Sequence, residues 1–182
     1  MKVTDTEIPD IKLIEPRLFP DQRGVFLETW NAQRYKEMLE TPPFVQDNFS
    51  HSCRGTLRGL HYQVEQVQGK LVHVSRGEVF DVALDIRESS PHFGQWICEY
   101  LSGENRKQLW IPPGFAHGFL VISETADLVY KCTDYYLPEA ERTIQWDDTA
   151  LSIDWPLGSI GAPTLSKKDQ HGVPFDDAEY YP

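Results

Sequence analysis

The sequence predicts an all-β fold, a barrel or sandwich of antiparallel strands, and three observations support this. Segments of about 5–9 residues rich in Val, Ile, Phe, Tyr and Trp recur, separated by Gly, Pro, Asn and Ser turns. Hydrophobic residues make up 40% of the 182 residues, enough for a sizeable core. Neither a strand–helix alternation nor a Gly-rich phosphate loop is found, which disfavours dinucleotide-binding folds. We therefore expect one domain over residues 1–182.

Ten segments are the candidate strands. They lie at residues 25–30, 56–63, 70–76, 79–86, 95–101, 107–111, 117–122, 127–133, 143–146 and 151–154. Alternation is clearest from Val79 to Ile86, where apolar residues share one face while Asp81 and Asp85 lie on the other, the pattern of a half-buried strand. Gly77 and Glu78 fall between two such segments and predict a tight hairpin turn.

One helix is predicted, from Asn31 to Leu39. Asn31 suits the N-cap position, because its side chain accepts a hydrogen bond from a free backbone N–H of the first turn. Tyr35, Met38 and Leu39 then lie on one side of the helix.

The charge of the chain limits its partners. With 28 acidic and 17 basic residues, the net charge is −11 at pH 7, which repels nucleic acid and anionic lipid. A small phosphorylated ligand stays compatible, because a few local Arg and Lys side chains outweigh a distant negative field. We expect no nucleic-acid partner.

Targeting signals and cysteine usage predict a cytoplasmic protein. No apolar run approaches the roughly 20 residues that a membrane-spanning helix needs, so no membrane partner is expected. No apolar stretch follows Met1–Glu7, so a secretory signal is not predicted. Cys53, Cys98 and Cys132 are odd in number and lack metal-type spacing, which predicts reduced thiols.

The turn from Asp21 to Gly24 is the first candidate ligand-binding segment. It leads into a predicted strand, and Arg23 carries a planar guanidinium that suits a phosphate. A solvated surface turn is the alternative, and this segment taken alone favours it.

Amide and basic side chains within apolar segments form the second candidate. Buried amides such as those of Gln46–Asn48 cost free energy unless they are hydrogen-bonded or line a wet cavity. His61 has the strand parity of Leu57, so we expect it to point inward, although a lone inward histidine is more often a core residue. Arg58 has the opposite parity. Both side chains therefore reach one ligand only if the strand kinks, as Gly59 allows.

Lys70 opens an apolar strand and is the third candidate. Its long side chain either extends to the rim of the barrel or holds a cation inside a cavity, opposite a developing oxyanion. The local sequence does not separate these interpretations.

The fourth candidate is a sharp turn followed by a histidine. Pro112, Gly114 and His117 have the spacing of the second cupin motif. Metal-binding cupins carry a His-x-His pair in their first motif, whereas the matching stretch here has His61 and then Gln63. Two histidines without a suitably spaced carboxylate make a poor metal site. We therefore expect a cupin barrel without a metal.

Eight motifs together resemble one family, the dTDP-4-dehydrorhamnose 3,5-epimerases, from about residue 8 to residue 169. Each motif is weak alone, but their order and spacing are specific. The motifs are Asp21–Gly24, Phe44–Asn48, Leu57–His61, Gln68–Val72, Gly77–Val82, Gln108–Pro112, Gly114–Phe119 and Leu165–Asp169. Residues 170–182 lie outside the resemblance.

The resemblance implies a double-stranded β-helix, the cupin jelly-roll barrel, with short peripheral helices. It also implies a homodimer and an isomerase that needs no metal and no other cofactor. The implied substrate is dTDP-4-dehydro-6-deoxy-D-glucose and the implied product dTDP-4-dehydro-β-L-rhamnose.

The resemblance also implies roles for individual residues. His61 matches the general base, Asp169 the carboxylate that pairs with it, Tyr130 the proton donor on the opposite face of the sugar, and Lys70 the group beside the C4 oxygen. The remaining matches surround the substrate: Arg23, Glu28, Gln46, Asp47, Asn48, Arg58, His117, Glu141 and Lys168 around the sugar and diphosphate, and Tyr136 stacked on thymine.

These residue types suit the implied chemistry. A hydrogen beside a ketone is acidic because its loss gives an enolate, which a cation such as Lys70 stabilises. Histidine has the unperturbed pKa nearest to neutral pH, so His61 suits a base, and Asp169 is expected to orient it and favour its charged form. Tyr130, neutral at pH 7, suits reprotonation from the other face.

Three alternatives remain open from the sequence. The first is a sugar-nucleotide-binding module without turnover, which does not need His61, Asp169 and Tyr130 together. The second is a metal-dependent cupin oxygenase or isomerase. The third is an epimerase that acts only at C3 or only at C5 and keeps the same base, acid and lysine.

Overall fold

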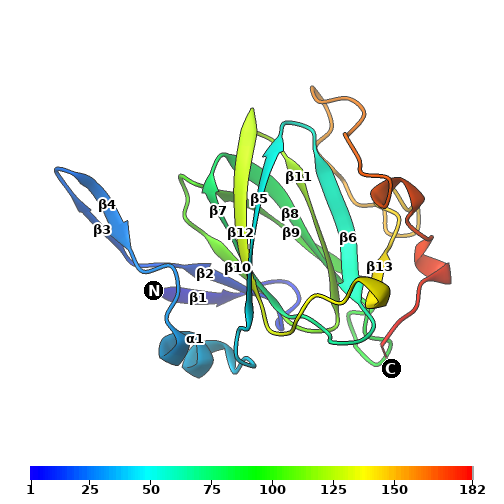
Figure 1. The fold of residues 1–182 in the computed structure, drawn as a ribbon, viewed down its shortest axis with the longest axis horizontal. Coiled ribbons are helices and arrows are strands. Elements are labelled where there is room, and N and C mark those ends of the chain that lie inside the picture. Colours follow the sequence, from blue (N-terminus) through cyan, green and yellow to red (C-terminus); the bar gives the residue numbers. More distant parts are fainter. Residues whose placement is uncertain (182) are drawn as a thin grey trace.

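The computed structural model describes residues 1–181 and contains two antiparallel β-sheets that face each other as a jelly-roll barrel (Figure 1). In spatial order, the six-stranded sheet holds β1 (Lys2–Asp5), β2 (Lys12–Glu15), β10 (Gln108–Ile111), β7 (Lys70–Arg76), β12 (Thr125–Cys132) and β5 (Gln46–Cys53). The five-stranded sheet holds β13 (Glu141–Thr143), β6 (Leu57–Gln63), β11 (Phe115–Val121), β8 (Glu78–Asp85) and β9 (Trp96–Ser102). The all-β prediction is confirmed.

A hairpin and four short helices lie outside the barrel. The strands β3 (Leu18–Asp21) and β4 (Gly24–Leu27) pair only with each other and project away from the two sheets (Figure 1). The helices are α1 (Ala32–Leu39) and the 3-10 helices η1 (Pro138–Ala140), η2 (Asp169–His171) and η3 (Phe175–Asp177). Within residues 1–181, no helix is long and apolar enough to cross a membrane.

The main core lies between the two sheets. Val72 and Leu128 from the six-stranded sheet pack with Ala83 and Phe119 from the five-stranded sheet, and all four are buried. A second cluster covers the outer face of the five-stranded sheet, where Leu57 and Leu60 meet C-terminal segments. Each sheet is therefore buried on the face that lines the barrel.

The predicted helix is confirmed at both ends. Asn31 is the N-cap, and its side chain accepts a hydrogen bond from the backbone N–H of Arg34 at 3.1 Å. Tyr35 is buried, while Met38 and Leu39 pack on the same small cluster at the outer face of the six-stranded sheet. The apolar side chains of α1 therefore cover this sheet, as the helical spacing predicts.

Strand β8 is buried on both faces, so the prediction of a half-buried strand is wrong. Val82 and its apolar partners face the outer cluster, whereas Asp81 and Asp85 are fully buried on the barrel side. Asp81 contacts His117, and Asp85 accepts hydrogen bonds from Arg87. The alternation is real, but its polar face points into the protein because each carboxylate has a partner there.

The hairpin predicted at Gly77 is also wrong. Strand β7 belongs to the six-stranded sheet and β8 to the five-stranded sheet, so Gly77 carries the chain from one sheet to the other. Its φ of +79° and the backbone of Thr125 beside it leave no room for a side chain. A tight turn is present, but it joins two sheets rather than two paired strands.

Several strand predictions need correction. Residues 151–154 form no strand, and β13 ends at Thr143. Strands β1, β2, β3 and β5 have no counterpart among the predicted segments. Strand β5 was missed because its sequence, QDNFSHSC, is mostly polar; it lies at a sheet edge, paired only with β12.

Candidate active site

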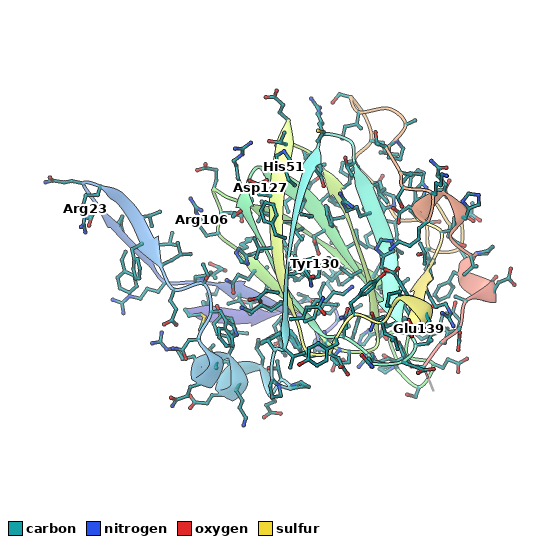
Figure 2. The ribbon with its side chains drawn as sticks, viewed as in Figure 1. Arg23, His51, Arg106, Asp127, Tyr130 and Glu139 are labelled. Carbon is teal, nitrogen blue, oxygen red and sulfur yellow. The ribbon has the colours of Figure 1, made fainter. Side chains whose placement is uncertain are left out.

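A cavity of about 370 Å³ lies inside the barrel, and side chains from both sheets line it. Figure 2 shows Tyr130 among the strands of the barrel. The lining residues are Gln46, Asn48, Phe49, Ser50, Arg58, His61, Gln68, Lys70, His117, Phe119, Tyr130, Tyr136, Glu141 and Lys168. Ten of these were predicted from the sequence: Gln46, Asn48, Arg58, His61, Lys70, His117, Tyr130, Tyr136, Glu141 and Lys168.

His61 and Asp169 form a hydrogen-bonded pair at the wall of this cavity. The Nε2 atom of His61 lies 2.5 Å from Oδ1 of Asp169, which also accepts a hydrogen bond from the backbone N–H of Gly59 at 3.2 Å. The hydroxyl of Ser166 donates to the other oxygen at 2.6 Å. Because Asp169 accepts at Nε2, that nitrogen carries the proton and Nδ1 of His61 is free to accept one.

The pKa values of the pair suit a neutral base beside an ionised carboxylate. Burial by itself would raise the pKa of Asp169, but the hydrogen bonds from His61, Ser166 and Gly59 lower it to about 2. Burial lowers the pKa of His61, and the cations Lys168 and Lys70 add to this effect, while Asp169 opposes it. Asp169 therefore favours the charged form of His61, as expected, but burial outweighs the carboxylate and the net shift of the His61 pKa is downward.

A bulge in β6 places Arg58 and His61 on the same side. Arg58 pairs with Phe119 and His61 pairs with His117, so three steps along β6 match two steps along β11. Gly59 supplies the irregularity with φ +130°, in van der Waals contact with the facing strand. The predicted kink is confirmed. The shared parity of His61 and Leu57 is wrong, because Leu57 packs on the outer cluster.

Lys70 is half-buried at the start of β7, where it lines the cavity, and its Nζ donates to the backbone carbonyl of His61 at 3.4 Å. Burial lowers its pKa, while nearby Cys132, Glu141 and Asp81 oppose the shift. The interpretation of Lys70 as a rim residue is therefore wrong. Its ammonium group lies inside the cavity, next to the strand that carries His61.

Tyr130 comes from β12 in the six-stranded sheet, whereas His61 comes from β6 in the five-stranded sheet. Both side chains line the cavity, so they approach it from opposite walls. Burial raises the pKa of Tyr130 to about 12, which keeps its phenol protonated at neutral pH. The arrangement provides a base and an acid on two sides of a shared space.

His117 lies beside His61 in the ladder between β11 and β6. Its Nε2 atom is 3.0 Å from both carboxylate oxygens of Asp81, and both residues are buried. Because Asp81 binds Nε2, the other ring nitrogen of His117 remains available to a ligand in the cavity, which His117 lines. A second oriented imidazole therefore lies next to the first.

One side of the cavity is polar and more exposed. The hydroxyl of Tyr136 donates to Glu141 at 3.0 Å, and Nζ of Lys168 lies 2.7 Å from the other oxygen of Glu141. Gln46 accepts from the backbone N–H of Tyr136 at 2.9 Å. With Arg58 and Lys70, Lys168 makes three cations around the cavity of a chain whose net charge is −11.

Three predicted residues lie away from this cavity. Arg23 is at the tip of the projecting hairpin, with 89% of its side chain exposed and paired with Asp21 (Figure 2). Glu28 follows the hairpin and pairs with Arg34 at 2.9 Å. Asp47 pairs with Lys131 on the outer face of β5, because its neighbours in the strand take the inner face.

Four lining residues were missed: Phe49, Ser50, Gln68 and Phe119. Ser50 has the strand parity of Gln46 and Asn48, so recognising β5 as a strand is enough to find it. Phe119 lies two residues beyond His117 on the same face of β11. Gln68 precedes its strand, and no local signal marks it.

Within the part of the chain that the structure describes, no group of three or more His, Cys, Asp or Glu side chains is arranged to hold a metal ion. The two histidines that line the cavity are each hydrogen-bonded to a carboxylate behind the cavity wall. His61 and His117 each bind a separate carboxylate, Asp169 and Asp81.

Comparisons with known proteins agree with each other. A family model described as dTDP-4-dehydrorhamnose 3,5-epimerase matches residues 5–177. A Pseudomonas aeruginosa protein named dTDP-4-dehydrorhamnose 3,5-epimerase is 56% identical, and the match covers 100% of both chains. An Escherichia coli protein of the same name is 49% identical, with 97% of this chain and 96% of that protein covered.

Solved structures of sugar-nucleotide epimerases also match this chain. A Legionella pneumophila dTDP-6-deoxy-D-glucose-3,5-epimerase in complex with dTDP-4-keto-L-rhamnose matches with a TM-score of 0.95 and 55% identity, over 98% of this chain and 94% of that chain. A 3'-monoepimerase from Streptomyces bikiniensis in complex with dTDP-quinovose matches with a TM-score of 0.86 and 30% identity, over 93% and 86% of the two chains.

Proposed function

The chain belongs to the dTDP-4-dehydrorhamnose 3,5-epimerase family, and from this premise we propose how its residues perform the reaction. It is an isomerase that converts dTDP-4-dehydro-6-deoxy-D-glucose to dTDP-4-dehydro-β-L-rhamnose. The reaction inverts two carbons, C3 and C5, which flank the ketone at C4. Each inversion needs a base on one face of the sugar and a proton donor on the other.

His61 is the base. Its Nδ1 atom accepts the proton from C5, and the electron pair of the broken C–H bond moves to the C4 oxygen as an enolate. Nε2 stays bound to Asp169, which stabilises the imidazolium that forms. Burial keeps the pKa of His61 below its ordinary value, so the imidazole is neutral before the reaction and able to accept the proton.

Lys70 and Tyr130 complete the step. The ammonium group of Lys70 stabilises the enolate oxygen, and an oriented donor of this kind is commonly worth about 3–4 kcal/mol. Tyr130 donates its phenolic proton to C5 from the other face, which inverts the carbon. Exchange with solvent removes the proton from His61 and reprotonates Tyr130. The same sequence then follows at C3.

The observation that carries this proposal is the approach of His61 and Tyr130 to one cavity from opposite sheets, with Lys70 beside them. A binding module without turnover does not need a histidine–aspartate pair facing a partly buried phenol. The cations Arg58 and Lys168 suit the diphosphate, and the exposed ring of Tyr136 suits stacking on thymine. Gln46, Asn48, His117 and Glu141 supply further polar contacts to the nucleotide sugar.

The test is exchange of the C3 and C5 hydrogens with deuterated solvent. His61→Ala should slow exchange at both carbons by about a thousandfold, within the range that a general base contributes. His51→Ala is the matched control, because His51 also pairs with an aspartate, Asp127, but does so at the surface (Figure 2). Undiminished exchange in His61→Ala, with dTDP binding kept, overturns the assignment.

Tyr130→Phe separates abstraction from inversion. The variant keeps the base, so exchange at C5 should continue, but inversion at C5 should fail because the proton returns from the same face. NMR of the product distinguishes the two. Deuterium at only one carbon of the product of the unmodified protein would instead identify a single-position epimerase.

We further propose that the protein works as a homodimer. The β3–β4 hairpin exposes four apolar side chains, Leu18, Phe19, Val25 and Phe26, on an element that projects away from the two sheets. Arg23 and Glu28 lie on or beside this hairpin, away from the cavity of their own chain. A hairpin that packs on a second copy brings both residues toward the partner's substrate.

Two further expectations remain proposals. We propose a cytoplasmic location, supported by cysteines that are all free thiols. We also propose that the chain acts as one domain, because N-terminal β1 and β2 join the six-stranded sheet while residues near the C-terminus pack on the five-stranded sheet. The role of Asp47 at the substrate rests on the family resemblance alone.

A further inference from the structure

The segment of residues 169–181, here called the C-terminal strap, holds three consecutive residues of β6. Asp169 pairs with His61 at 2.5 Å. The hydroxyl of Tyr62 donates to the backbone carbonyl of Glu179 at 2.7 Å. The hydroxyl of Tyr181 donates to the backbone carbonyl of Gln63. The strand that carries the base is therefore attached to the strap at His61 and at both residues after it.

The strap is itself anchored on the barrel. Val173 forms a bridge with Ile144, and Glu179 pairs with Arg142 at 3.0 Å. At its end, the backbone carbonyl of Tyr181 accepts from the N–H of Glu88 at 2.8 Å. The bonds to β6 therefore come from a fixed segment, and they can position the strand.

Tyr181 also lines an inner recess of the candidate active site. A second cavity of about 80 Å³ shares His61, Lys70 and Tyr130 with the larger cavity. Tyr181 lines this recess together with Gln63. Tyr181 therefore forms part of the wall of the recess.

Gln63 links the strap to another part of the site. Its side chain accepts from the backbone N–H of Leu137 at 2.9 Å and donates to the carbonyl of Tyr135 at 3.2 Å. These two residues flank Tyr136, which lines the main cavity. A shift of β6 at Gln63 therefore moves both the base and the loop that carries Tyr136.

A purely structural interpretation is that the strap covers the apolar outer face of the five-stranded sheet. Phe175, Ala178, Tyr180 and Tyr181 do pack on that cluster. A cover needs the apolar surface of these side chains but not the hydroxyl groups of the two tyrosines. The hydrogen bond from the hydroxyl of Tyr181 to the carbonyl of Gln63, two residues after His61, is not explained by a covering role alone.

We propose that the C-terminal strap is a positioning element for the epimerisation, and that Tyr181 is its positioning residue. Tyr181 fixes β6 at Gln63 through its hydroxyl and excludes water from the inner recess through its ring. The inference rests on the proposed role of His61 as the base. Apart from Asp169, it assigns a function to a segment that lies outside the eight motifs of the resemblance.

The first experiment compares Tyr181→Phe with Tyr180→Phe. Tyr180 is the matched control, because its hydroxyl donates to Phe175 within the strap and its side chain lines neither cavity. Tyr181→Phe should lower kcat about fivefold, as expected for one lost hydrogen bond, with KM changed less than twofold. Tyr180→Phe should leave both constants unchanged. Equal effects in the two variants overturn the proposal.

The second experiment is the pH profile of kcat/KM for Tyr181→Ala, which opens the recess. Water admitted there relieves the burial that lowers the pKa of His61, so the acidic limb should move to higher pH. Loss of folding stability alone does not move this limb, and the thermal unfolding midpoint is measured beside it. An acidic limb unchanged from the unmodified protein overturns the proposal.

The outcomes separate this inference from the assignment of the base. If His61→Ala keeps full exchange, the role of His61 fails. If His61→Ala is inactive but Tyr181→Phe matches Tyr180→Phe, the base stands and the strap is only a cover.

Discussion

The carboxylate of Asp169 receives hydrogen bonds from three groups, two of which lie on β6, more than 100 residues away in the sequence. His61, Ser166 and the backbone of Gly59 all donate to it, and its side chain is 2% exposed. A buried carboxylate with this many donors stays ionised, because each donor stabilises the charged form. Asp169 therefore both orients His61 and connects the C-terminal strap to β6.

The same bonds predict a loss of stability in acid. The pKa of Asp169 is about 2, below the ordinary value of 3.8, so its contribution is complete above about pH 4 and is lost as the pH falls toward 2. We expect the unmodified protein to lose about 2 kcal/mol of unfolding free energy from this group over that range. Urea titrations at several pH values measure the loss.

Asp169→Asn is the reference for that measurement. Asparagine does not titrate, so the difference in unfolding free energy between the two proteins should shrink as the pH falls from about 4 to about 2. A difference that stays constant over this range would show that Asp169 is not the group responsible.

At the scale of single elements, β6 depends on its bulge. The bulge turns Arg58 and His61 to the cavity while Leu57 and Leu60 face the outer cluster. A regular strand cannot do this, because its side chains alternate strictly. Gly59 permits the arrangement because it combines φ +130° with close contact to Gly118.

Gly59→Ala should therefore destabilise the protein strongly. A Cβ atom at Gly59 would lie 2.4 Å from Cα of Gly118, in a backbone conformation that side chains disfavour. We expect a loss of about 3 kcal/mol or more in unfolding free energy. Gly158→Ala is the control, since a Cβ there meets nothing within 4 Å. Equal urea midpoints for the two variants contradict this account.

The elements differ in how well their sequences reveal them. Helix α1 was predictable because its cap and its apolar side are local patterns. Strand β5 was not, because an edge strand that lines a wet cavity carries polar residues on both faces. Missing β5 also meant missing Ser50 as a lining residue.

At the scale of the whole molecule, the hairpin is the part that the barrel leaves uncovered. Phe26 is 71% exposed and lies across the hairpin from Phe19, with ring centroids 6.2 Å apart. Exposed apolar side chains gathered on a projecting element are typical of an association surface. Contact with a second copy accounts for this surface and for the remote position of Arg23.

Phe26→Ser should therefore shift the protein from dimer to monomer, because it removes the most exposed ring of the hairpin. Sedimentation velocity measures the oligomeric state. Tyr100→Ser, which removes an exposed ring from β9 instead, should leave it unchanged. A monomer in the unmodified protein, or a dimer that survives Phe26→Ser at micromolar concentration, contradicts the proposed surface.

The sequence by itself determined the fold class, the helix, the kink at Gly59 and most residues of the cavity. These features depend on local periodicity and on residue types in ordered motifs, both of which can be read along the chain. The family resemblance in the sequence also pointed to His61, Tyr130 and Lys70 for the proposed roles of base, acid and cation.

Only the tertiary structure decided which of these groups meet. His61 and Asp169 are 108 residues apart, and strand pairing between distant segments brings them to 2.5 Å. The tertiary arrangement also places Arg23 and Asp47 outside the cavity and brings Tyr181 to the inner recess that His61 lines. Burial then lowers the pKa of His61, because the solvent exposure of a side chain depends on the whole barrel rather than on its neighbours in sequence.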